Sequence, residues 1–204
     1  MPPSSRPARA RTESQAGPFI LYVEGPRDRD VLRIWCQRHR PEAVPTVRSA
    51  VILGGRQPNR ALAHLSRLRA AEPGARGLCV LDLDHALDPD PAGDEPSLEF
   101  FTWTRRHIES YLLVPHALRR LARNPKERFR LERFVRERLP AEGDEAAWRR
   151  LDAKRLVERD GPLARTLGRP LPAGASARAI RLDELHGDVL ALLDRIRRSD
   201  AAPS

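Results

Sequence analysis

The chain is poor in cysteine and lacks long apolar segments. Two cysteines among 204 residues are too few for a disulfide framework, and Cys36 and Cys79 lack the paired spacing of a zinc site. No apolar stretch approaches the roughly 18 residues that a membrane span needs. The Pro-, Ser- and Arg-rich N-terminus has no apolar core of a secretory signal. We therefore expect a cytoplasmic protein, one domain plus extensions, with no membrane partner.

Lysine is also scarce, yet the chain is basic, with a formal net charge of +9. Residues 19–115 carry 13 basic and 13 acidic side chains, whereas residues 116–204 carry 21 and 14. A basic segment of this kind favours binding to nucleic acid. However, only two of the 37 basic residues are lysine, and an arginine bias on solvated helix faces accounts for the same surplus. Both interpretations remain open.

Apolar runs alternate with helical patterns in the first half of the chain. We expect helices at 27–39 and 58–71 between successive strands, an order that predicts right-handed crossovers and a parallel sheet. The expected strands are 19–24, 46–53, 77–82 and 98–102. Further helices are expected at 105–123, 126–138, 144–158 and 181–198, with a polar loop at 85–97 and a linker at 161–176. The predicted division is a disordered tail (1–18), an α/β catalytic domain (19–123) and a basic helical C-terminal extension (124–204).

Four acidic side chains occupy informative positions. Glu24 ends the first apolar run, Asp82 and Asp84 end the third, and Glu109 follows the fourth. The carboxyl ends of parallel strands meet at one edge of a sheet, so these carboxylates are expected to converge there. Converging carboxylates need a cation, and oxygen ligands favour Mg²⁺ or Mn²⁺ over zinc. The sequence therefore predicts a metal-dependent enzyme that acts on phosphate.

The residues after Glu24 fit a phosphate site. Gly25 permits close approach of the backbone, and the N-terminus of the following helix attracts anions. Asp28 lies one helical turn further, where it would face the same metal pocket. In the alternative interpretation Asp28 only complements the helix dipole.

The remaining acids are weaker signals when taken alone. In a strand, Asp82 and Asp84 would point to one face and could share metal ions. Glu109 lies beside an apolar helical stripe, where an acid is costly to bury without a partner. Pairing with Arg105 or Arg106 is the simpler explanation for Glu109.

Several segments together resemble a known family. The run Ile20–Leu32 resembles the first motif of the Toprim domain, and Asp82-Leu83-Asp84 resembles its second. Trp103–Leu113 is similar to the Trp, Arg, acid-Ile-Glu-Asn-Tyr-Leu-Leu signature of overcoming-lysogenisation-defect (OLD) nucleases. Gly54-Gly55-Arg56 and Asp152–Leu156 resemble a Gly-Gly-Lys segment and a lysine-bearing helix of that group. The resemblance implies a Toprim fold, with a four-stranded parallel sheet flanked by helices and Mg²⁺-dependent cleavage of nucleic acid.

The resemblance also implies roles for the acids. Glu24, Asp82 and Asp84 would hold a first metal ion, and Asp28 and Glu109 would help to hold a second. Two such ions stabilise the attacking and leaving oxygens of an in-line displacement.

Basic residues and glycines complete the implied site. Arg56 or Lys154 would neutralise charge on the phosphate, beside the backbone of Gly25 and Gly55. Two departures from the family weaken this picture. His107 stands where many relatives have an acid, and Arg56 replaces a lysine and does not donate its proton near neutral pH.

The sequence leaves the biological setting open. It contains no Gly-x-x-x-x-Gly-Lys-[Ser/Thr] segment, so we expect either a stand-alone Toprim protein or the nuclease half of a two-protein system with a separate ATPase partner. DNA is a better candidate substrate than RNA, in phage defence or repair. One alternative is a non-catalytic Toprim module that binds nucleic acid or a partner protein. Another is a haloacid-dehalogenase-like phosphatase with Asp82 as nucleophile and Asp84 as acid, although His85-Ala86 replaces the usual Gly-Thr.

Overall fold

The computed structural model describes residues 17–83 and 95–200. Within them, four strands form one all-parallel sheet in the order β2-β1-β3-β4. The strands are β1 (Phe19–Val23), β2 (Val51–Ile52), β3 (Arg76–Leu81) and β4 (Leu98–Thr102). The predicted four-stranded parallel sheet flanked by helices is therefore confirmed.

The register aligns the carboxyl ends of the strands. Val23 at the end of β1 pairs with Val80 of β3 and with Ile52 at the end of β2. Leu81 at the end of β3 pairs with Thr102 at the end of β4. All four strands therefore finish at one edge, and the segments that follow them start side by side.

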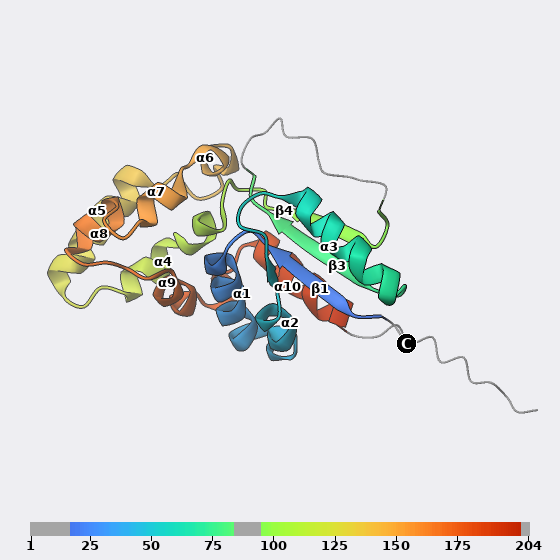
Figure 1. Ribbon diagram of the computed structural model, residues 1–204. Coiled ribbons are helices and arrows are strands. Elements are labelled where there is room, and N and C mark those ends of the chain that lie inside the picture. The colour runs from blue at the N-terminus through green and yellow to red at the C-terminus, as the bar shows by residue number, and fades with distance from the viewer. Residues whose placement is uncertain (1–16, 84–94, 201–204) are drawn as a thin grey trace, which may run out of the picture.

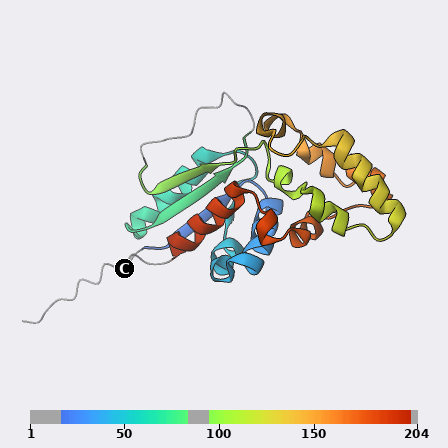
Figure 2. The same ribbon diagram turned by 180° about the vertical axis from the view of Figure 1, so that it is seen from behind.

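Helices cover both faces of the sheet (Figures 1 and 2). One face packs against α1 (Pro26–His39), α2 (Val44–Arg48) and α10 (Gly187–Asp200). The other face packs against α3 (Pro58–Ala71). Alternation along the strands supplies both cores, because Leu78 and Val80 face the first layer while Cys79 and Leu81 face α3.

A second, wholly helical core lies beside the sheet (Figure 1). Short helices surround it, because Pro and Gly residues repeatedly start and stop them. Its elements are α4 (Pro115–Arg120), α5 (Pro125–Arg138), α6 (Glu145–Arg150), α7 (Ala153–Val157), α8 (Pro162–Leu167) and α9 (Ala173–Ala179). We call these six helices the helical lobe. Three 3-10 turns, η1 (Pro41–Ala43), η2 (Ile108–Leu112) and η3 (Leu182–Glu184), complete the described elements.

Several element boundaries differ from the sequence predictions. Within the strand expected at 46–53, residues 46–48 belong to the end of α2, which has Pro45 in its first turn, and only Val51–Ile52 pair with the sheet. The helix expected at 105–123 is divided into η2 and α4, because Pro115 begins a new helix. The linker expected at 161–176 contains α8 and the start of α9, with Gly168 in the left-handed conformation (φ +70°) ending α8.

Two further boundaries differ from the sequence predictions. The helix expected at 144–158 is divided because Asp152 caps α7, its side chain accepting a hydrogen bond from the Arg155 N–H. The helix expected at 181–198 begins as η3 and continues as α10. At α7, a local cap rather than a change in the apolar pattern sets the boundary.

Helix α10 belongs to the sheet core although it lies in the predicted C-terminal extension. Its Val189, Leu192, Leu193 and Ile196 are buried together with residues of β1 and α1. The division at residue 123 stays a prediction about folding units. The predicted tail and polar loop fall largely outside the described residues. Among the described helices, none combines the length and the apolarity needed to cross a membrane.

We expect the substitution Leu192→Ala to lower the free energy of unfolding by about 2–5 kcal/mol, because Leu192 is fully buried against the sheet. The matched control Leu182→Ala removes the same atoms from a side chain that is 49% exposed, and should cost less than about 0.5 kcal/mol. Urea unfolding measures both values. Equal stability of the two variants would show that α10 is not part of the core.

Candidate active site

Glu24 and Asp82 meet at the carboxyl edge of the sheet. Glu24 follows β1 and Asp82 follows β3, and these strands are neighbours. The backbone N–H of Asp82 donates to Glu24 Oε1 at 2.7 Å. Both side chains are buried, with 8% and 3% of their surface exposed. The Glu24 carboxylate thus lies against the backbone of Asp82, at the edge where both strands end.

Lys154 supplies the positive charge next to Asp82. Its Nζ donates to Asp82 Oδ2 at 2.7 Å from helix α7, in the helical lobe. Burial lowers the pKa of Lys154, but the hydrogen bond and charge of Asp82 outweigh it and raise the pKa. Burial also raises the pKa of Asp82, against the opposing effect of Lys154. The helical lobe therefore contributes directly to the site.

Asp28 lies in the same group of charges and also caps helix α1. Its Oδ2 accepts a hydrogen bond from the Gly25 N–H at 2.7 Å, so the helix-terminus role considered for Asp28 is real. Burial and the nearby charges of Asp82, Glu109 and Glu24 raise the pKa of Asp28 to about 7. Burial is the largest cause and the neighbouring carboxylates add to it, so Asp28 is only partly ionised near neutral pH.

Glu109 reaches the site from η2 and pairs with a residue that the sequence did not single out. It is 2% exposed, and its Oε1 accepts from Arg27 Nη1 at 2.8 Å. The suggested pairing with Arg105 or Arg106 is wrong, because Arg105 instead makes two hydrogen bonds to Glu145. No local sequence signal indicates this pairing, because the two residues are 82 positions apart.

Glu109 Oε2 and His107 Nδ1 are among the buried polar atoms that have no hydrogen-bond partner within the described residues. His107 is buried, and its pKa is lowered by that burial and by the charge of Lys154, with Asp82 and Glu109 opposing. His107 is therefore a neutral imidazole near pH 7. An unpartnered carboxylate oxygen and a neutral imidazole nitrogen are the kinds of atom that bind a cation or an ordered water.

The Gly54-Gly55-Arg56 segment lies against the carboxyl ends of β1 and β3. The N–H groups of Gly54 and Gly55 donate to the Glu24 carbonyl at 2.9 and 3.0 Å. Both glycines have positive φ (+82° and +122°), a conformation that other residues rarely adopt. Arg56 Nη1 donates to the Asp82 carbonyl at 2.9 Å. The segment therefore sits on both acid-bearing strand ends.

The residues of the OLD-like signature mainly build the support for Glu109. Trp103 packs on Tyr111 with ring centroids 4.8 Å apart, and the Tyr111 hydroxyl donates to Asp188 Oδ2 of α10 at 2.5 Å. The Arg105 guanidinium lies over Trp148 of α6, 4.3 Å from the ring centre. Because α6 leads directly into α7, this contact also helps to place Lys154.

The predicted metal set is only partly covered by the structure. Asp84 lies outside the described residues. Among residues 17–83 and 95–200, no three His, Cys, Asp or Glu side chains are arranged as ligands of one metal ion. The carboxylates that are present nevertheless suit a hard cation by their oxygen donors and by the Glu109 Oε2 atom, which has no hydrogen-bond partner among the described residues.

The raised pKa of Asp28 predicts a pH dependence of stability. An aspartate that ionises near pH 4 when unfolded and near pH 7 when folded stabilises the fold at low pH. This contribution is lost as the pH rises from about 4 to about 7. Asp28→Asn keeps an oxygen acceptor for Gly25 but cannot ionise. In EDTA, we expect the stability that the parent loses between pH 5 and pH 8 to exceed the loss in Asp28→Asn by about 2–4 kcal/mol.

Urea unfolding at both pH values measures this difference. Asp30→Asn is the control, because Asp30 lies on the same helix but is exposed. Asp30→Asn should follow the parent. Parallel pH profiles for the parent and Asp28→Asn would contradict the crowding of carboxylates.

Comparisons with known proteins support the architecture. No protein-family model and no curated protein matches the chain. Among solved structures, the C-terminal region of the Burkholderia pseudomallei OLD protein matches with a TM-score of 0.50 and 16% sequence identity, over 91% of this chain and 99% of that one. The resemblance read from the sequence is thus confirmed at the level of the fold: the chain is built like the Toprim-type C-terminal region of an OLD protein.

Proposed function

We propose that this chain is a divalent-metal-dependent nuclease that cleaves or nicks DNA, of the OLD-like Toprim type. The observation that carries the proposal is the group of buried acids at the carboxyl edge of the sheet. Glu24 and Asp82 are in contact there, and the charges of Glu109, Asp82 and Glu24 all act on Asp28. Burying several carboxylates together is costly, so the arrangement calls for a function that uses it.

The acids would hold the metal. Glu24 and Asp82, with Asp84, would be its ligands, and Asp28 and Glu109 would extend the site towards a second ion. Oxygen donors favour Mg²⁺ or Mn²⁺. When bound, the metal would supply activation of water and neutralisation of charge on the phosphate.

Basic side chains around the acids would hold the scissile phosphate. Lys154 is 44% exposed and reaches Asp82 from the helical lobe, so its ammonium group can serve both a carboxylate and a substrate oxygen. Arg27 is half exposed beside Glu109, and Arg56 lies on the Asp82 strand end. Fixed cations at a reacting phosphate stabilise charge that develops in the transition state.

A second candidate is a non-catalytic module that binds nucleic acid. It is favoured by the Lys154–Asp82 ion pair, in which a side chain already occupies an oxygen expected to bind metal. A phosphatase that uses Asp82 as nucleophile is a third possibility. Asp82 follows the third strand along the chain rather than the first, and it is 3% exposed.

Incubation with supercoiled plasmid, linear DNA and RNA tests the proposal. We expect cleavage in Mg²⁺ or Mn²⁺ and none in EDTA. Glu24→Gln and Asp82→Asn keep the shape of each side chain but weaken metal binding, so each should lower the rate by about 100-fold or more. The exposed residue Asp30 provides a matched control, Asp30→Asn, which should cleave like the parent.

Cleavage that persists in EDTA, or in both acid variants, would contradict the mechanism. Binding without cleavage under all metal conditions would favour the non-catalytic module. Hydrolysis of a small phosphomonoester that is lost in Asp82→Asn, with no nuclease activity, would favour the phosphatase.

A further inference from the structure

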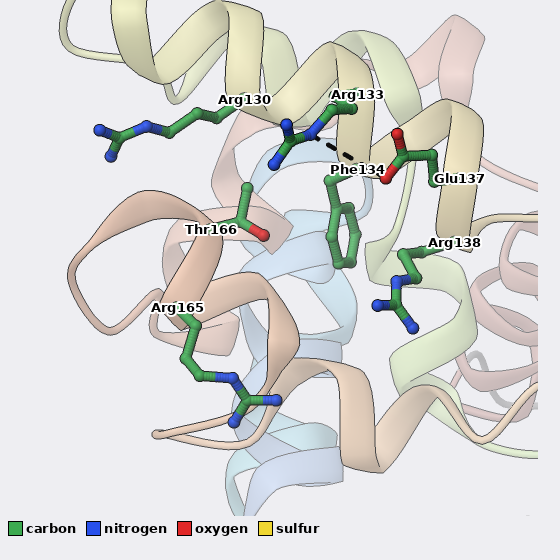
Figure 3. A pocket seen from close by; sticks show the side chains of 7 residues that line it. All are labelled: Arg130, Arg133, Phe134, Glu137, Arg138, Arg165 and Thr166. Atoms are coloured by element: carbon green, nitrogen blue, oxygen red, sulfur yellow. Dashed lines mark ion pairs between the residues drawn. The ribbon is translucent and has the colours of Figure 1, made fainter.

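A groove rich in arginine lies in the helical lobe, away from the acids. It has a volume of about 260 Å³ between α5 and α8. Figure 3 shows Phe134 at its centre, with Thr166 on the facing helix. The other side chains that line it are Arg130, Arg133, Glu137, Arg138 and Arg165. Four guanidinium groups thus share the groove with one carboxylate.

This charge is not neutralised within the described part of the chain. Glu137 lies 3.9 Å from Arg133 and is also 3.9 Å from Arg136, so its single charge is divided between two arginines. Arg130 and Arg138 are exposed and have no hydrogen bond or ion pair among the described residues. Clustered cations without matching acids favour an anionic ligand.

The groove walls are held in place by packing that does not use these arginines. Leu131 and Phe134 of α5 are buried against Leu163 and Leu167 of α8. At one end of the pair of helices, Glu127 of α5 forms an ion pair with Arg169 at 3.2 Å. The arginines in the groove can therefore be changed without removing the contacts that join the two helices.

An exposed aromatic ring lies next to the groove. Phe129 is 67% exposed and precedes Arg130. It is also four residues before Arg133, so the two side chains share a face of α5. Cationic side chains beside an exposed aromatic ring suit nucleic acid, in which phosphates alternate with bases that can stack. A small inorganic anion has no base that could stack on this ring.

We propose that the α5–α8 groove binds the phosphodiester backbone of nucleic acid at a distance from the catalytic edge. The proposal deepens the proposed function and depends on it for the identity of the ligand. Helix α7, which carries Lys154, lies between the groove and the sheet (Figures 1 and 2). A strand held in the groove would thus continue past Lys154 towards Glu24 and Asp82.

Binding in EDTA tests the groove without requiring cleavage. The variant Arg130→Gln/Arg138→Gln removes two charges from the groove. The control Arg128→Gln/Arg136→Gln removes two charges from the same helix at the same spacing of eight residues, outside the groove. Affinity for a fluorescent single strand and a duplex is measured by anisotropy over a range of salt concentrations, and thermal unfolding checks each variant.

We expect the groove variant to bind more weakly and with a lower salt dependence. The slope of log K against log salt should decrease by about 1.4 for the single strand and about 1.8 for the duplex, the values for two lost phosphate contacts. The control should retain more of the parent's affinity and slope. Arg165→Gln, on the opposite wall, gives an independent test if the double variant loses its fold.

Three results would overturn the proposal: parental binding in the groove variants, equal losses in groove and control variants, or equally tight competition by an acidic polyglutamate peptide, which would indicate a protein ligand. The nuclease proposal fails separately. If binding depends on the groove arginines but the parent never cleaves, the groove proposal is supported and the nuclease proposal is rejected. If the protein cleaves nucleic acid but its binding does not depend on Arg130 and Arg138, the nuclease proposal is supported and the groove proposal is rejected.

Discussion

The rest of the site depends on how several negative charges are accommodated at one edge of a parallel sheet. Each buried acid has a specific compensation. The Glu24 carboxylate accepts a hydrogen bond from the backbone N–H of Asp82. The Asp82 carboxylate accepts one from the ammonium group of Lys154, and the Glu109 carboxylate accepts one from the guanidinium group of Arg27. Asp28 instead retains its proton more strongly, with a pKa raised to about 7. Positive charges and hydrogen bonds from other parts of the chain thus offset part of the cost of burying these acids.

One of these compensating charges comes from the helical lobe. Lys154 comes from α7, and α7 is placed by the contact of Arg105 with Trp148 and Glu145 on α6. The same lobe carries the arginine groove between α5 and α8. One body thus contributes a cation to the acidic edge of the sheet and a separate cationic surface beyond it. Such a division would let substrate binding and chemistry be adjusted by different residues.

Much of the α/β part could be predicted from the sequence, because strong apolar runs fix strands β1, β3 and β4 and the helices between them. The two-residue strand β2 could not, since Val44 to Leu53 has an apolar pattern that suits a strand and a short Pro-started helix alike. In the helical lobe, the sequence predicts fewer and longer helices than the structure contains. Caps such as Asp152 and Gly168 act through local hydrogen bonds and φ angles rather than through periodicity.

The acids of the site were accessible to sequence reasoning, whereas their partners mostly were not. Glu24 and Asp82 stand out because they end apolar strands. The pairing of Glu109 with Arg27 joins residues 82 positions apart, and no local pattern reports such a contact. Lys154 was accessible only through the resemblance to a family helix. Long-range charge pairing therefore had to come from the structure.

The central claim is that the acids at the sheet edge bind a divalent cation. Mn²⁺ binding near pH 7.5, followed by electron paramagnetic resonance, tests it without any substrate. The account predicts saturable binding in the parent and in Asp30→Asn, and an affinity lower by roughly tenfold or more in Glu24→Gln. Absence of saturable binding in the parent, or the same affinity in Glu24→Gln, would contradict it.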